Sequence, residues 1–173
     1  MKTQEIEVIN LEPVSFLSNV QMVGEGFFAV CDTEDADQLA TVGLYICKGI
    51  SIYNSSSQRG TLAHLAYTRS LKPSLDSIVD GFGEDLTSSD VLIVGTEQSA
   101  GRHWPDIDSI AQYFLKHNPR SLTVDRNIPE RSPRSMAIRL SDGKVSEVDL
   151  PSARAAWLTK PNTSLNQPIL DKV

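Results

Sequence analysis

The sequence predicts a single α/β domain. Its 173 residues suit one globular domain and are few for two. With 40% hydrophobic and 22% charged residues, the chain can build a core and has too little charge for wholesale disorder. Apolar runs of strand length alternate along the chain with two segments of helical periodicity, which indicates strands and helices in one fold.

The clearest strand pattern lies between residues 41 and 66. Two short apolar runs, 43–47 and 49–53, precede the polar segment 54–60, and a third run, 62–66, follows it. This pattern predicts a strand, a polar turn and a returning strand. Further strands are expected at 20–30 with a bulge at Gly24 or Gly26, at 91–94 and 121–124, and as a hairpin of 136–140 with 145–148.

Two segments have the spacing of amphipathic helices. Pro73 and Ser74 can open the first, whose apolar face carries Leu75, Ile78, Val79 and Phe82. Asp106 or Asp108 starts the second, with an apolar face of Ile107, Ile110, Ala111, Phe114 and Leu115 and a stop at Asn118-Pro119. We divide the chain into an N-terminal arm or strand (1–19), a main domain (20–150) and a C-terminal extension (151–173), which begins with a short helix around 153–158.

Charge and apolar patterning restrict the partners and the compartment. The net charge of −6 disfavours binding to nucleic acid or to an anionic membrane, because both need clustered Lys and Arg. A protein or a small molecule is the expected partner. No apolar run has the length of a signal-peptide core or a bilayer span, so we expect a cytoplasmic protein without membrane insertion; secretion by a signal-less route would leave no trace in the sequence.

Cys47 and His64 stand on either side of the predicted turn, so a hairpin can bring a thiol beside an imidazole across seventeen positions. Imidazole next to a thiol favours the thiolate, so the pairing predicts a depressed pKa for Cys47 and a nucleophile with its base. Thr41 lies six residues before Cys47, and a bend at Gly43 would return its hydroxyl toward His64. The alternatives are a buried structural thiol, a core histidine bonded to backbone, and an ordinary strand threonine.

The second cysteine, Cys31, has no nearby histidine and is expected to serve packing. Two cysteines are too few for a disulfide scaffold and lack the paired spacing of a zinc site. One bridge between Cys31 and Cys47 stays open, although a nucleophilic Cys47 would have to remain reduced. We expect neither a metal nor an organic cofactor.

These residues resemble the signature of the CheD family, the chemoreceptor glutamine deamidases of bacterial chemotaxis. The similar elements are Thr41, Cys47 within a strand, the segments 49–53 and 60–64 ending in His64, and the two intervals between the three residues. Weaker similarity covers roughly 20–150. The resemblance implies layered mixed β-sheets with about two main packed helices, and a catalytic triad of Cys47, His64 and Thr41.

The resemblance implies that the protein hydrolyses the side-chain amide of a glutamine on another protein to glutamate and ammonia. It also implies chemoreceptors as substrates and a CheC-type phosphatase as partner. The chain departs from the family pattern before the nucleophile, where Tyr45-Ile46 replace Gly-Ser, and at 127–133, where a Gly-Asn-rich loop is expected. Two alternatives therefore stand beside this function. One is a deamidase or transamidase effector retargeted to another protein, and the other is a non-catalytic binding module of the same fold.

Two other groups are candidates for contacts with a partner. Arg102, His103 and Trp104 form a polar loop that can touch substrate or be a plain solvated turn. A sparse basic band can meet an acidic partner, or be ordinary surface charge; its members are Arg120, Arg126, Arg131, Arg134 and Arg139.

Overall fold

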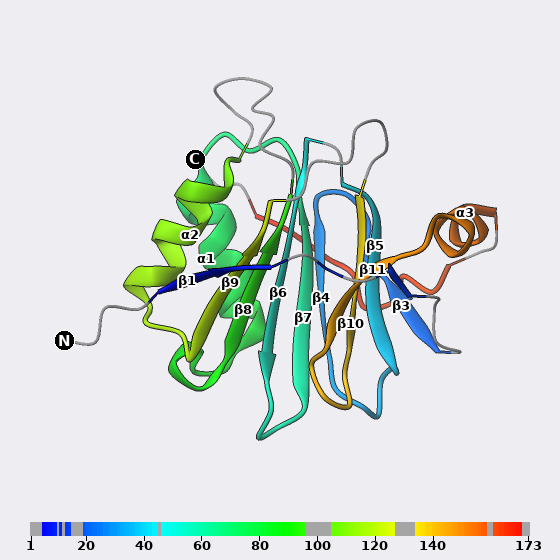
Figure 1. Cartoon of the computed structure of the whole chain (residues 1–173), viewed down its shortest axis with the longest axis horizontal. Helices are drawn as coiled ribbons and strands as arrows, with labels where there is room; N and C mark the ends of the chain where they lie inside the picture. The colour runs from blue at the N-terminus through cyan, green and yellow to red at the C-terminus, as the bar shows by residue number, and fades with distance from the viewer. Residues whose placement is uncertain are drawn as a thin grey trace.

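A computed structural model describes residues 5–9, 11, 13–14, 19–44, 46–95, 105–126, 134–158 and 161–170. Two β-sheets pack face to face in these ranges, with α1 (Leu71–Phe82) and α2 (Ile107–Lys116) on one side and α3 (Leu150–Leu158) on the other (Figure 1). The layers therefore run helix, sheet, sheet, helix. This arrangement confirms the predicted α/β class with layered mixed sheets. α3 is the short helix expected around 153–158, and it begins three residues earlier, at Leu150.

The larger sheet contains the hairpin predicted on either side of the polar segment 54–60. Its seven strands lie in the order β1-β9-β8-β6-β7-β4-β12. Their bounds are β1 Ile6–Val8, β9 Ser121–Asp125, β8 Asp90–Val94, β6 Lys48–Asn54, β7 Arg59–Leu65, β4 Phe27–Cys31 and β12 Gln167–Pro168. β6 and β7 form the predicted antiparallel hairpin, while β9 pairs in parallel with both β1 and β8, so the sheet is mixed.

The smaller sheet has five strands in the order β2-β11-β10-β5-β3. Their bounds are β2 Pro13–Val14, β11 Val145–Val148, β10 Arg134–Arg139, β5 Gln38–Leu44 and β3 Val20–Met22. The expected hairpin of β10 and β11 is present, and β5 is its neighbour. One continuous strand over 20–30 is wrong: β3 and β4 belong to different sheets, and the chain turns between them at Gly24–Phe27, where Gly26 has φ +81°.

Both main helices form where apolar spacing predicts them, but the predicted start of α1 at Pro73-Ser74 is wrong: the helix begins at Leu71, and its N-cap residue, Ser70, makes no side-chain capping bond. Asp106 caps α2 by accepting a hydrogen bond from the Ser109 N–H at 2.8 Å, and α1 ends at Gly83, whose left-handed conformation suits glycine. Both helices bury their apolar faces against the larger sheet, as Leu75, Ile78, Phe82, Ile110 and Phe114 are fully buried there.

A second core lies between the two sheets and brings them close together. Gly49 on β6 shows how close: a Cβ added there would stand 2.2 Å from Met136 Sδ and 2.9 Å from Leu44 Cδ1. Only glycine fits at this position without moving the facing sheet. The candidate site lies at one edge of this inter-sheet core.

Candidate active site

The fold brings Thr41, Cys47 and His64 together from three places in the chain. Thr41 lies on β5 of the smaller sheet, His64 lies on β7 of the larger sheet, and Cys47 directly precedes β6. His64 is paired with Gly49, so Cys47, two positions before Gly49, approaches the same face of the sheet. The site is therefore built across the gap between the two sheets.

Thr41 reaches His64 because β5 is irregular at Gly43. Between Leu44 and Thr41, β5 uses one residue more than β10, which is a β-bulge, and Gly43 there has φ +82°. The bend predicted at Gly43 is confirmed. Thr41 is fully buried, with its hydroxyl directed into the space between the sheets.

The Thr41 hydroxyl fixes the tautomer of His64. Its oxygen lies 2.7 Å from the Val23 carbonyl, to which it donates its one proton, and 2.8 Å from His64 Nδ1. Having no second proton, the hydroxyl must accept from Nδ1–H. The proton of a neutral His64 therefore sits on Nδ1, and the lone pair on Nε2. Among the described residues, Nε2 is buried and has no hydrogen-bond partner.

Cys47 lies close to this imidazole without a hydrogen bond to it. The Cys47 sulfur and a ring nitrogen of His64 are within 4.8 Å of each other. Cys47 lies in a bend just before β6, so its expected position within a strand is wrong, and its side chain is 5% exposed. A thiol at this distance needs only a small side-chain movement to meet Nε2, and such contacts commonly tighten when substrate binds.

Burial decides the resting protonation of the pair. It raises the pKa of Cys47 to about 11, assisted by the negative charge of Glu25 and opposed by Lys48. Burial also lowers the pKa of His64 to about 4. The depressed pKa predicted for Cys47 is therefore wrong, because the desolvation of the thiolate exceeds the effect of its neighbours. At neutral pH the pair is a thiol and a neutral imidazole.

Glu25 is a member of the cluster that the sequence interpretation missed. It lies exposed in the turn between β3 and β4, and a carboxylate oxygen, the Cys47 sulfur and a His64 ring nitrogen all lie within 4.8 Å of one another. A strand through 20–30 gave no reason to single it out. The signal that was available is the Gly24-Glu25-Gly26 sequence, which is typical of a tight turn.

A cavity of about 180 Å³ opens beside His64 and Glu25. Its other walls come from β3, β5 and the C-terminal segment, through Met22, Val23, Gly24, Val42, Gly43, Pro161 and Thr163. The C-terminal segment is held there because Asn162 O accepts a hydrogen bond from Met22 N at 2.7 Å. The part of the chain assigned to a C-terminal extension thus forms one wall of the site.

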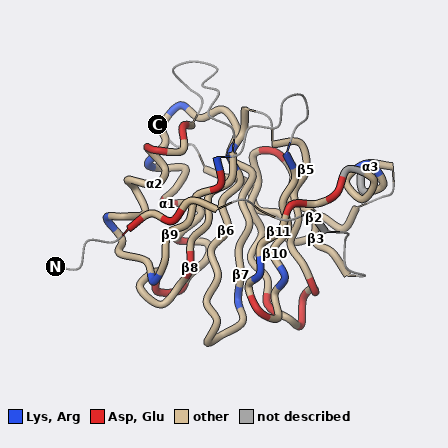
Figure 2. The backbone as a smooth tube through the Cα atoms, in the orientation of Figure 1, with Lys and Arg blue, Asp and Glu red and all other residues tan. Residues whose placement is uncertain are grey.

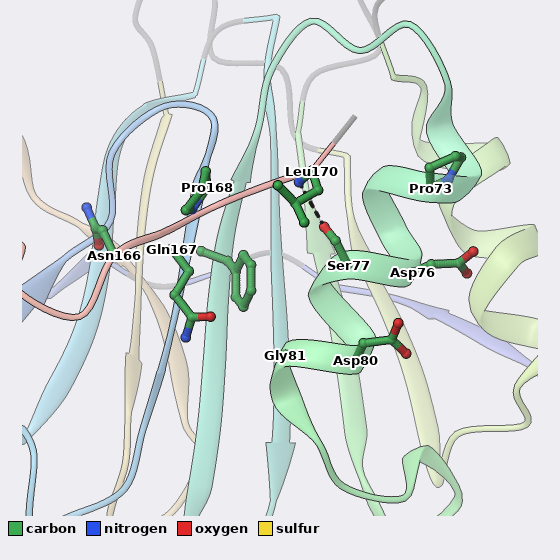
Figure 3. Close-up of a pocket in the computed structure, with 10 residues that line it drawn as sticks. Pro73, Asp76, Ser77, Asp80, Gly81, Asn166, Gln167, Pro168 and Leu170 are labelled. Atoms are coloured by element: carbon green, nitrogen blue, oxygen red, sulfur yellow. Dashed lines mark hydrogen bonds between the residues drawn. The ribbon is translucent and has the colours of Figure 1, made fainter. Parts of the chain in front are cut away.

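A larger cavity, about 520 Å³, lies elsewhere, between α1 and the C-terminal segment (Figure 3). Leu170 N donates to Ser77 Oγ across it at 3.1 Å, and Asp76 and Asp80 on α1 point away from the C-terminal segment. None of the residues that line it is a cysteine or a histidine. This cavity is therefore not a candidate for the cysteine–histidine chemistry predicted from the sequence, although it is larger than the cavity beside His64.

The predicted basic band is largely neutralised within the chain. Arg120, Arg126 and Arg139 pair with Asp90, Asp108 and Asp142 on the surface, and Arg134 makes a buried pair with Asp125 at 2.7 Å. Basic and acidic residues both occur at several places on the described chain (Figure 2). Arg131, Tyr45, the loop with Arg102, His103 and Trp104, and the 127–133 segment lie outside the described residues.

Cys31 is fully buried and, like Cys47, free. The bridge between the two cysteines that the sequence left open is therefore absent. Burial, helped by Asp35 and Asp32, raises the pKa of Cys31 to about 12. The expected packing role fits this position, which belongs to the core between the sheets.

Comparisons with known proteins find similarity to solved structures only. No protein-family model and no curated protein matches the chain. Among solved structures, it is similar to the Neisseria meningitidis protein NMB0706, described as DUF152, with a TM-score of 0.42 and 11% sequence identity. The likeness covers 71% of this chain and 64% of that one, so this chain spans less than two thirds of the Neisseria protein. It carries no argument about chemistry, and the resemblance to CheD stays a hypothesis.

No helix among the described residues combines the length and the apolar character needed to cross a membrane.

Proposed function

We propose that this protein is a cysteine-dependent protein-glutamine deamidase of the CheD type, with Cys47 as nucleophile, His64 as general base and acid, and Thr41 as the residue that positions His64. The observation that carries the proposal is the Thr41–His64 hydrogen bond of 2.8 Å, which leaves the Nε2 lone pair of His64 free on a ring that has a nitrogen within 4.8 Å of the Cys47 sulfur. This is the arrangement of nucleophile, base and orienting group on which covalent acyl-transfer catalysis depends.

The reaction begins from the neutral pair. His64 Nε2 takes the thiol proton while the Cys47 sulfur attacks the carbonyl carbon of a glutamine side chain, and the backbone N–H of Cys47 holds the oxygen that becomes negative. His64 then returns the proton to the departing nitrogen as the C–N bond breaks. Ammonia leaves, and a thioester between Cys47 and the substrate remains.

Water completes the cycle. His64 Nε2 removes a proton from the water that attacks the thioester, the carbon–sulfur bond breaks, and the thiol is re-formed with glutamate as product. An amine in place of that water would give transamidation. The Cys47 thiol and the attacking water supply every proton that moves in these steps, and His64 carries each of them, so the reaction as written needs no cofactor.

The cavity beside His64 favours a side chain over a whole small molecule as substrate. Its volume of about 180 Å³ is below the roughly 300 Å³ at which pockets for drug-sized ligands begin. Apolar Met22, Val23 and Val42 suit the methylene groups of a glutamine. We propose a protein substrate, with chemoreceptors as the first candidates, a CheC-type phosphatase as a docking partner, and the reducing cytoplasm as the working compartment.

One observation favours the alternative of a non-catalytic binding module. The pKa of Cys47 is raised to about 11, so no thiolate is present at rest to mark the site as activated. The retargeted deamidase or transamidase, in turn, is favoured by the Tyr45-Ile46 sequence before the nucleophile. Only turnover separates these alternatives.

The test is intact-mass analysis of candidate proteins incubated with the wild type or with Cys47→Ala. We expect the wild type alone to give the small mass gain of amide-to-acid conversion, with equimolar ammonia. The cytoplasmic helical domain of a chemoreceptor is the first substrate to try, followed by glutamine-containing proteins from other sources. Ammonia release by Cys47→Ala at the wild-type rate would refute the mechanism, and conversion only of proteins other than chemoreceptors would support the retargeted enzyme.

A further inference from the structure

We infer that Cys47, His64 and Glu25 form a binding site for a thiophilic divalent cation of the Zn²⁺ class. The three side chains offer a sulfur, a ring nitrogen and a carboxylate oxygen that all lie within 4.8 Å of one another. Sulfur, imidazole nitrogen and carboxylate oxygen are the donors that zinc uses in proteins. This inference stands whether or not Cys47 is a catalytic nucleophile.

The distances leave little to adjust. Zinc bonds of about 2.0–2.3 Å in a tetrahedral arrangement place neighbouring ligand atoms about 3.5 Å apart. Atoms already within 4.8 Å can reach that spacing by side-chain movement alone. Most of this movement can come from the Glu25 side chain, because Glu25 is exposed in a turn. Cys47 and His64 are buried and have less freedom to move.

His64 is prepared as a ligand in the manner usual for metal-binding histidines. Such histidines donate a hydrogen bond from the nitrogen that does not bind the metal, which fixes the tautomer and the ring orientation. Here Thr41 accepts that bond from Nδ1–H. His64 is 3% exposed, and its Nε2 is buried and has no hydrogen-bond partner among the described residues. A buried nitrogen without a partner is costly, and a metal ion would satisfy it.

Three protein ligands leave one position of the tetrahedron open. His64 and Glu25 both line the cavity of about 180 Å³, so that position can face it and be filled by water or by a small anionic or thiol group. Binding replaces the S–H bond of Cys47 with an S–metal bond and releases the proton to solvent. The same ion occupies both the attacking sulfur and the basic nitrogen, so it would inhibit a deamidase that uses them.

The proton balance makes affinity depend on pH in a defined direction. A cysteine binds such an ion as the thiolate, so Cys47 must release its proton when the ion binds. The apparent affinity should therefore increase about tenfold for each pH unit between 6 and 8, with one proton released per ion.

Cobalt is the probe for the experiment, because Co²⁺ replaces Zn²⁺ and its absorption reports ligands and geometry. Titration of the full chain with Co²⁺ is expected to give one equivalent of a tetrahedral spectrum with a thiolate-to-cobalt charge-transfer band, which equimolar Zn²⁺ bleaches. Cys47→Ala should lose the band and Cys31→Ala should keep it. Glu25→Gln, an exposed substitution that leaves the fold alone, should weaken the apparent affinity at least about tenfold.

Each outcome bears on the metal site separately from catalysis. Weak octahedral absorption without the charge-transfer band, or a band that survives in Cys47→Ala, would overturn the inference. Unchanged affinity in Glu25→Gln would remove Glu25 from the site and overturn the three-ligand form proposed here. If the chain binds Co²⁺ as expected and converts no glutamine, the metal site is supported and the deamidase function is refuted. If the chain converts glutamine and does not bind Co²⁺ in this way, the deamidase function is supported and the metal site is refuted.

Discussion

Thr41 Oγ1 lies 2.8 Å from His64 Nδ1, and this hydrogen bond connects the two β-sheets. The threonine belongs to β5 of the smaller sheet and the histidine to β7 of the larger sheet. The same hydroxyl donates to Val23 O at 2.7 Å. The Val23 carbonyl therefore fixes the direction of the Thr41 hydroxyl, and the hydroxyl fixes the orientation of the imidazole. The geometry of the candidate site therefore depends on how the sheets pack.

Thr41→Val should lower turnover without removing the nucleophile. The substitution keeps the shape of the side chain, but it leaves Nδ1–H and the Val23 carbonyl unpaired in a buried place, at about 1–3 kcal/mol. We expect kcat to fall by roughly tenfold to a hundredfold, with a smaller change in KM, in the ammonia-release assay. Thr41→Ser retains the hydroxyl and should recover most of the activity; equal loss in both variants would show that the hydroxyl does not position His64.

The neutral state of His64 should make stability depend on pH. Burial lowers its folded pKa to about 4, whereas the unfolded side chain takes up a proton near its ordinary value of 6.5. Between these values the unfolded state binds more protons, so the free energy of unfolding falls as pH falls, by about 3 kcal/mol at most.

Urea unfolding at pH 7 and pH 4.5 measures this effect, with His64→Gln as the matched variant that has no titrating ring. The wild type should lose more stability than the variant between the two pH values, because other groups titrate alike in both. A loss of the same size in both proteins would place the folded pKa of His64 near its ordinary value.

Alkylation of Cys47 should report a thiol rather than a thiolate. With a pKa raised to about 11, the rate of reaction with iodoacetamide should climb about tenfold per pH unit from 7 to 10. Cys31, fully buried and with its pKa raised to about 12, should remain unmodified in the folded protein and serves as the internal control. Peptide mapping by mass gives both rates. A plateau near neutral pH would indicate a thiolate–imidazolium pair instead.

Local patterns were enough to predict the hairpin, both main helices and the bend at Gly43. Each depends on neighbours in the chain: apolar spacing, turn residues, and a capping aspartate at Asp106. The same patterns also placed Cys47 and His64 close together, since a hairpin of fixed register brings its two arms side by side.

Three features depend on distant parts of the chain, and the sequence did not give them. Glu25 enters the site because β3 and β4 join different sheets, which alternation over 20–30 does not reveal. The raised pKa of Cys47 results from burial by both sheets, which outweighs the nearby imidazole. Pro161 and Thr163 reach the cavity through a backbone bond to Met22, a contact across most of the chain's length.

Gly49→Ala should destabilise the protein by disturbing the packing between the two sheets, without replacing a residue of the proposed triad. The added Cβ would stand 2.2 Å from Met136 Sδ and 2.9 Å from Leu44 Cδ1, so the smaller sheet must move or the side chains must leave their rotamers. Such overpacking costs about 1–3 kcal/mol, which a lower urea midpoint would measure. Gly24→Ala is the control, because its nearest neighbour would be 3.6 Å away.

The same substitution should also disturb the Thr41–His64 bond, since Gly49 is the strand partner of His64 and Leu44 follows Thr41 on β5. We expect Gly49→Ala to lower turnover more than its loss of stability alone explains, when assayed well below its unfolding midpoint. If the urea midpoint falls while turnover of the folded protein is unchanged, the sheets can separate locally without moving the triad, and the dependence of the site on their packing would be disproved.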